Sequence, residues 1–80
     1  MKTYAGIDLH SSNSFVGILD EQDKRLFNKR LPNDLDVILT ALEPFRNSLA
    51  AIVVESTYNW YWLVDGLMDA GYPVHLANPS

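Results

Sequence analysis

The sequence predicts an α/β domain with one mixed β-sheet, on three observations. The run Leu49–Glu55 is apolar and rich in β-branched residues up to its final carboxylate, which is typical of a central parallel strand with both faces covered. Strand-like runs on either side of the polar segment Asp20–Asp23 predict an antiparallel hairpin. Apolar residues recur at helical spacing before and after Leu49–Glu55. Right-handed crossovers then make the first, fourth and fifth strands parallel, and the hairpin continues the sheet antiparallel.

The first half of the chain supplies three of the expected strands. The run Thr3–His10 is largely apolar and carries one carboxylate, Asp8, in its second half. Further strands are expected at Ser14–Leu19 and Arg25–Leu31. The predicted order is therefore strand, strand, strand, helix, strand, helix, strand.

Both helices show start or stop signals. The first has apolar residues at positions 35, 38, 39, 42 and 45, with Asn33 or Asp34 as N-cap and an end close to Pro44. The second has apolar residues at positions 60, 63, 64, 67 and 68, and Gly71 suits the left-handed residue that closes a helix. A last short strand is expected at Pro73–Ala77.

Length and composition limit the possible classes of protein. Eighty residues allow one domain, and 48% apolar with 20% charged residues indicates a folded chain. The chain has no cysteine and no apolar run of membrane-spanning or signal-peptide length, so we expect a cytoplasmic protein without membrane contact. Because the sequence stops straight after a strand, with no last helix to cover the sheet, we expect residues 1–80 to be part of a longer domain.

Two carboxylates stand where parallel strands end. Open α/β sheets bind ligands at the carboxyl ends of their strands, and Asp8 and Glu55 belong to strands that we expect to be neighbours. A strand spacing of about 4.8 Å would bring both within reach of one Mg²⁺ ion, which accepts one or two carboxylates together with water and phosphate oxygens. His10 should share the face of Asp8 and is a possible auxiliary residue that steers a phosphate or a proton.

Structural roles for the same residues stay open. Asp8 can instead cap a turn through the Ser11 or Ser12 amide, and Glu55 can simply begin a loop. The cluster Lys24–Arg30 can contact a phosphate backbone, or it can protect an exposed strand edge from aggregation. A net charge of −4 argues against binding a polyanion by general electrostatics.

Four motifs in order give the chain a family resemblance. They are Tyr-Ala-Gly-Ile-Asp-Leu-His at 4–10, Val-Val-Glu-Ser-Thr at 53–57, Trp-Tyr-Trp-Leu at 60–63 and His-Leu-Ala-Asn-Pro at 75–79. With them the sequence resembles the start of the DEDD transposases of bacterial insertion sequences, which are related to Piv-type DNA invertases. The resemblance implies an RNase H-like domain of the RuvC type, and it places the first two family acids on Asp8 and Glu55.

The resemblance also implies an activity and partners. It implies a transposase that cleaves and recombines the DNA of an insertion element with Mg²⁺, or Mn²⁺ as a substitute, and that in some members is guided by a structured RNA. The remaining two acids and a serine lie outside these 80 residues, so the 80 residues alone should be inactive. A homo-oligomer is the expected assembly.

Two other classes of function remain possible. Gly6-Ile7-Asp8 followed by Ser11 and Ser12 is similar to the first hairpin of actin and sugar-kinase ATP-binding domains, although His10 stands where a phosphate loop wants glycine. A non-catalytic dimerisation module is the other alternative, since the aromatic residues at 58, 61 and 62 exceed what a helix core needs.

Overall fold

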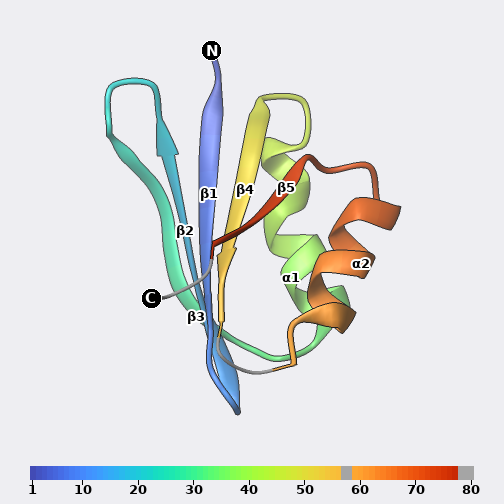
Figure 1. Cartoon of the computed structure of the whole chain (residues 1–80). Helices are drawn as coiled ribbons and strands as arrows, with labels where there is room; N and C mark the ends of the chain where they lie inside the picture. Colours follow the sequence, from blue (N-terminus) through green and yellow to red (C-terminus); the bar gives the residue numbers. More distant parts are fainter. Residues whose placement is uncertain (57–58, 78–80) are drawn as a thin grey trace.

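The computed structural model describes residues 1–56 and 59–77, which form one mixed sheet and a layer of helices (Figure 1). The strands are β1 (Thr3–Leu9), β2 (Asn13–Asp20), β3 (Arg25–Pro32), β4 (Leu49–Glu55) and β5 (Val74–Ala77). The helices are α1 (Leu35–Leu42) and α2 (Tyr61–Asp69), and a 3₁₀ turn, η1 (Glu43–Phe45), follows α1. The expected order of elements is thus confirmed in the described part of the chain.

The strands lie in the order β3-β2-β1-β4-β5. β1 pairs antiparallel with β2 and parallel with β4, β4 pairs parallel with β5, and β2 pairs antiparallel with β3. The central position of β1 is what places Asp8 beside Glu55, because β1 and β4 are neighbours in register. The predicted parallel trio and antiparallel hairpin are both present.

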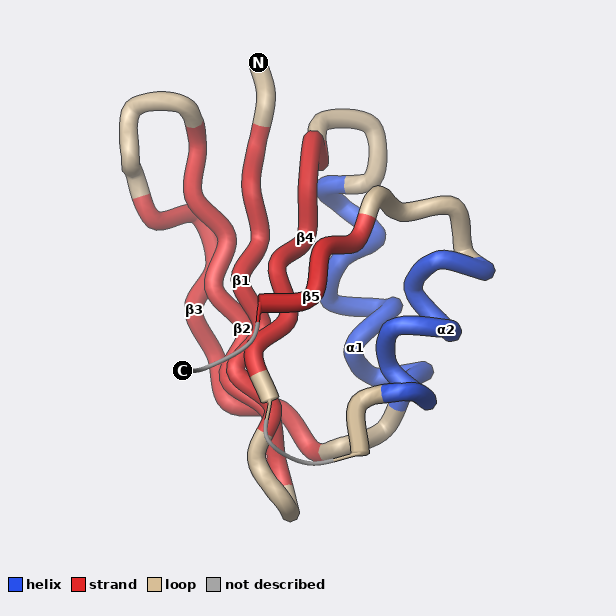
Figure 2. The backbone as a smooth tube through the Cα atoms, in the orientation of Figure 1, coloured by secondary structure: helices blue, strands red, loops and turns tan. Residues whose placement is uncertain are grey.

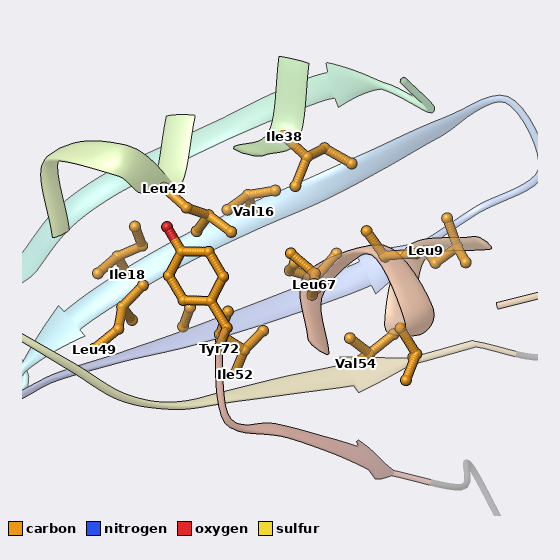
Figure 3. Packing of buried hydrophobic residues seen from close by; sticks show 14 residues of the cluster. Leu9, Val16, Ile18, Ile38, Leu42, Leu49, Ile52, Val54, Leu67 and Tyr72 are labelled. Carbon is orange, nitrogen blue, oxygen red and sulfur yellow. The ribbon is translucent and has the colours of Figure 1, made fainter. Parts of the chain in front are cut away.

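Both helices pack against the same face of the sheet (Figure 2). Side chains that point to this face are almost inaccessible to water: Ile7 is 2% exposed, and Val16, Ile52 and Val54 are 0% exposed. They meet Ile38 and Leu42 from α1 and Leu63 and Leu67 from α2 (Figure 3). This single cluster is the hydrophobic core, and burying one such side chain contributes about 1.5–3 kcal/mol.

The opposite side of the sheet, which we name the open face, has no helix over it in the described structure. It is identified by alternation, because the neighbours of buried strand residues point the other way. The open face consists of Tyr4, Gly6 and Asp8 on β1, Phe15, Gly17 and Leu19 on β2, Arg25, Asn28 and Arg30 on β3, Ala51, Val53 and Glu55 on β4, and His75 and Ala77 on β5. Polar, charged and exposed apolar groups therefore share this side.

Turns and caps follow the local chemistry of the sequence. The Asp20 carboxylate accepts hydrogen bonds from the backbone N–H groups of Gln22 and Lys24, at 2.8 and 2.9 Å, and so closes the β2–β3 turn. Of the two expected N-caps of α1 it is Asp34 that accepts from the Asp36 N–H, at 2.9 Å. Gly71 adopts φ 95° after α2, as expected for the residue that ends a helix.

Element ends differ from the expectation by one or two residues. α1 stops at Leu42, close to Pro44 as expected, and Pro44 itself lies in the following turn η1. β1 ends at Leu9, one residue before the predicted end. Trp60 is the N-cap of α2, not a residue of its first turn. Assigned ends of helices commonly differ by one or two residues, so these differences leave the order and pairing of the elements unchanged.

Candidate functional site

Asp8 and Glu55 are register partners at the carboxyl ends of two parallel strands. Both are exposed, and the preceding residues Ile7 and Val54 are buried against the helices. The two carboxylates therefore project from the open face at the same level, across one strand spacing of about 4.8 Å. Because both carboxylates are exposed, water can solvate their charges. No buried cation is needed to offset the cost of desolvating them.

His10 lies one residue past the end of β1 and contacts Asp8. Its Nε2 is 3.2 Å from Asp8 Oδ2, and both side chains are 58% exposed. The predicted proximity of His10 to Asp8 is thus confirmed, while its auxiliary role stays a prediction. The contact is an ion pair when the imidazole is protonated, and it places the ring against the carboxylate.

Asn33 fixes the chain at this end of the sheet. Its Nδ2 donates a 2.7 Å hydrogen bond to the backbone carbonyl of His10, and its Oδ1 accepts a 2.6 Å hydrogen bond from Ser14 Oγ. One side chain from the β3–α1 connection thereby holds the β1–β2 turn. The sequence indicated Asn33 only as a possible helix cap; a polar side chain beside a strand-breaking proline was the available signal.

A shallow hollow of about 480 Å³ lies in the middle of the open face. Gly6 and Gly17 face each other across β1 and β2 and form its floor, because neither has a side chain and a methyl group added at either would meet no atom within 4 Å. Tyr4, Phe15 and Val53 border the hollow and are 44%, 40% and 38% exposed. Asp8 and Glu55 stand at one end of it.

A smaller pocket of about 240 Å³ opens past the end of β1. It is lined by Leu9, His10, Ser11, Asn33, Asn59 and Trp62. Through the His10–Asp8 contact this pocket adjoins the carboxylate pair.

The carboxylate pair fits part of a divalent-metal site. Mg²⁺ takes oxygen ligands and is commonly held by one or two carboxylates plus water and phosphate, which Asp8 and Glu55 can provide. Two-metal sites need more acids, and no group of three or more His, Asp or Glu side chains suited to a metal exists within residues 1–56 and 59–77. The donor set matches one ion and is incomplete for two.

The structure brings the expected site residues together, and in the part of the chain that it describes it does not show the competing role of Asp8 as a turn cap. Asp8 and Glu55 share a face and a level, and His10 touches Asp8. The contact recorded for Asp8 in the described residues is with His10, not with the Ser11 or Ser12 amide. Parts of two quoted motifs, residues 57 and 78–79, and the aromatic residue at 58 lie outside the described residues.

The sheet order, the helices on one face and the acids at the strand ends define an RNase H-like domain of the RuvC type. RuvC from T. thermophilus in complex with a Holliday junction substrate has the same fold, with a TM-score of 0.78, 17% identity, and 99% of this chain covering 66% of the RuvC chain. In sequence, residues 5–80 match the DEDD transposase family of the IS110 type, and the chain belongs to this transposase family.

Two sugar-kinase-like structures share the fold at lower similarity. A candidate N-acetylmannosamine kinase from Listeria monocytogenes gives a TM-score of 0.54 at 14% identity, with 95% of this chain covering 35% of that one. A ROK family protein from Streptococcus pneumoniae in complex with sucrose gives 0.51 at 22% identity, with 95% covering 34%. None of the curated proteins matches the sequence. The chain thus spans two thirds or less of each of these structures.

None of the helices in the described part of the chain is long and apolar enough to cross a membrane.

Proposed function

We propose that this chain is the first part of the catalytic domain of a transposase that cleaves and recombines the DNA of an insertion element. The observation that carries the proposal is the register pair Asp8–Glu55, which puts two exposed carboxylates side by side at the carboxyl ends of parallel strands. Membership of residues 5–80 in a transposase family and the RuvC-type fold support it.

In the proposed mechanism Asp8 and Glu55 would hold a divalent metal ion, Mg²⁺ or its substitute Mn²⁺. When bound, such an ion supplies Lewis-acid activation and charge neutralisation for phosphodiester cleavage. Asp8 and Glu55 would fix the position of the cleaved phosphate at the end of the sheet. His10 would hold the Asp8 carboxylate in place through its 3.2 Å contact.

The 80 residues do not supply a full set of acidic ligands, so we place the remaining acids in the parent protein beyond this chain. Tyr4 and Val53 on the apolar border of the hollow would then be covered there. Guidance by an RNA of the element and assembly into a homo-oligomer are part of the same proposal.

A test uses the intact transposase and a synthetic DNA duplex that carries an end of its element. Asp8→Asn and Glu55→Gln keep side-chain size but remove the charge, and each should lower strand cleavage by at least about 100-fold while DNA binding is kept. Asp65→Asn is the matched control, since Asp65 is exposed on α2 away from the site. Full cleavage by the Asp8→Asn variant would refute the proposed metal site.

A nucleotide-binding domain is the alternative that the kinase likenesses raise. His10 contacts the Asp8 carboxylate at the position where a phosphate loop requires backbone N–H groups close to the phosphates. Calorimetric titration with ATP and Mg²⁺ separates the two, because the transposase proposal expects no ATP binding that depends on Asp8.

A further inference from the structure

The strand register sets five residues in one row across the open face at the level of the acids. From the β3 edge to the β5 edge the row is Arg30, Phe15, Asp8, Glu55 and Ala77. Arg30 is the row's cation, and it lies on the same side of the sheet as the carboxylate pair. A straight path across the strands therefore leads from the pair to Arg30.

Arg30 is available to an anion. Its side chain is exposed, and no ion pair or hydrogen bond of its guanidinium is recorded within the described residues. Its sequence neighbour Lys29 is paired with the buried Val16 and so points to the helix-covered face, where its Nζ lies 5.8 Å from the ring centroid of Phe27. Lys29 and Arg30 are thus adjacent on β3 but project from opposite faces of the sheet.

The distance along the row suits a nucleic-acid backbone. β3 and β1 are separated by two strand spacings, roughly 10 Å, which is beyond salt-bridge reach between Arg30 and Asp8. The rise of 3.4 Å per nucleotide is measured along the helix axis, and neighbouring phosphates of one strand are farther apart because the strand winds around that axis, so roughly 10 Å reaches a phosphate about one to two nucleotides away. A strand whose phosphate sits at Asp8 and Glu55 can place a neighbouring phosphate at Arg30.

The charges at this end of the sheet favour such a contact. Asp8 and Glu55 repel a DNA backbone until a metal ion neutralises them, and the chain carries a net charge of −4 with no Lys or Arg after Arg46. A guanidinium can hold a phosphate through two parallel N–H donors, and phosphate contacts of this kind fix the register of the nucleic acid. The exposed amide of Asn28, two residues earlier on the same face, stands beside it.

We propose that Arg30 forms a second phosphate subsite, which binds a DNA backbone phosphate about one to two nucleotides from the phosphate cleaved at Asp8 and Glu55. The proposal rests on the proposed function for the position of the cleaved phosphate. It replaces edge protection as the role of Arg30, because a cation that only guards the β3 edge could stand on either face of the strand, as Lys29 does.

The first experiment measures DNA affinity of the intact transposase in EDTA, without metal or cleavage, as a function of salt. Arg30→Ala should weaken binding to the element-end duplex about tenfold at low salt and reduce the salt slope by about 1, as expected for the loss of one phosphate contact. Lys29→Ala is the matched control and should change neither. Equal effects of the two variants would overturn the proposal in favour of general electrostatics or edge protection.

The second experiment locates the phosphate. Single neutral methylphosphonates are placed at successive positions around the mapped cleavage site, and each is tested with wild type and Arg30→Ala. At one position, about one to two nucleotides from the cleaved bond, the substitution should weaken wild-type binding and add nothing to Arg30→Ala. Additive losses at all positions would refute the contact. Because this measurement needs no metal, it can succeed even where Asp8→Asn shows that the proposed metal site is wrong.

Discussion

The two faces of the sheet are built by the same strands but carry different chemistry. On the helix-covered face, Ile7, Val16 and Ile52 are at most 2% exposed, whereas Val53 on the open face is 38% exposed. Strand alternation makes each strand contribute to both faces. Because carboxylates are costly to bury, Asp8 and Glu55 stand on the face where burial is not needed for folding in these 80 residues. Adjacent residues of one strand therefore have different roles: one packs in the core that stabilises the fold, and the next belongs to the face that carries the candidate site.

The largest expected difference between the faces is in packing. Ile52→Ala removes a fully buried side chain from the core and should lower the free energy of unfolding by about 2–5 kcal/mol. Val53→Ala, one residue on, should cost less than about 1 kcal/mol, because its side chain already meets solvent. Urea denaturation of the two variants measures both values. Equal losses would show that the open face is covered in solution.

Two glycines, Gly66 in α2 and Gly17 on the open face, test the same difference between the two faces. A methyl group at Gly66 in α2 would overlap the Leu35 side chain, which must then move, and overpacking of this kind costs about 1–3 kcal/mol. Alanine gains about 1 kcal/mol over glycine inside a helix, so Gly66→Ala should destabilise the chain by up to about 2 kcal/mol. On the open face a methyl group at Gly17 meets no atom within 4 Å, and removing strand glycine should leave stability unchanged or raise it by up to about 1 kcal/mol.

The same pair of variants tests the proposed longer domain. If other parts of the transposase cover the hollow, Gly17→Ala should be harmless in the 80-residue chain and destabilising in the intact protein, as followed by thermal unfolding. Gly66→Ala should be harmful in both. A harmless Gly17→Ala in the intact protein would contradict the proposed covering.

The fold could be predicted from the sequence largely because its signals are local. The apolar run Leu49–Glu55, the polar turn at Asp20–Asp23 and the two helical patterns determine the elements, and crossover handedness then determines the sheet order. The neighbouring positions of Asp8 and Glu55 followed from that order. The rest depends on three-dimensional detail.

Cross-strand register could not be predicted from local sequence patterns. The β2–β3 pairing shifts by one residue between Ile18 and Leu19, near the hairpin turn. This shift is the reason that Arg30 lies in the same row as Phe15 and Asp8. Counting back from the turn without that shift would have placed Arg30 beside Ser14 on the covered face. The bridging role of Asn33 likewise needs the β1–β2 turn and the β3–α1 connection to lie close together.

The smallest expected effect concerns Tyr72, a polar group on the covered side. Tyr72 is 5% exposed, its ring packs in the core, and its hydroxyl is buried with no hydrogen-bond partner in the described structure (Figure 3). The Arg46 guanidinium lies over the ring, 4.7 Å from its centroid. Tyr72→Phe keeps the ring and this cation–π contact and removes the unpaired hydroxyl. It should therefore raise the free energy of unfolding at pH 7 by about 1 kcal/mol.

The same hydroxyl predicts the direction of a pH effect. Burial raises the pKa of Tyr72 above its ordinary value, Arg46 opposes this rise, and Glu43 adds to it. The folded state therefore binds the phenol proton more tightly than the unfolded state, so this contribution to stability is complete below about pH 10 and is lost as the pH rises through the folded pKa. Chemical denaturation at pH 7 and pH 11 should show wild type losing more stability than Tyr72→Phe over this interval.

Tyr61→Phe is the matched control, since Tyr61 is 61% exposed and its hydroxyl is already solvated. If Tyr61→Phe and Tyr72→Phe gave the same difference between the two pH values, the buried hydroxyl would not be the group that couples folding to alkaline pH.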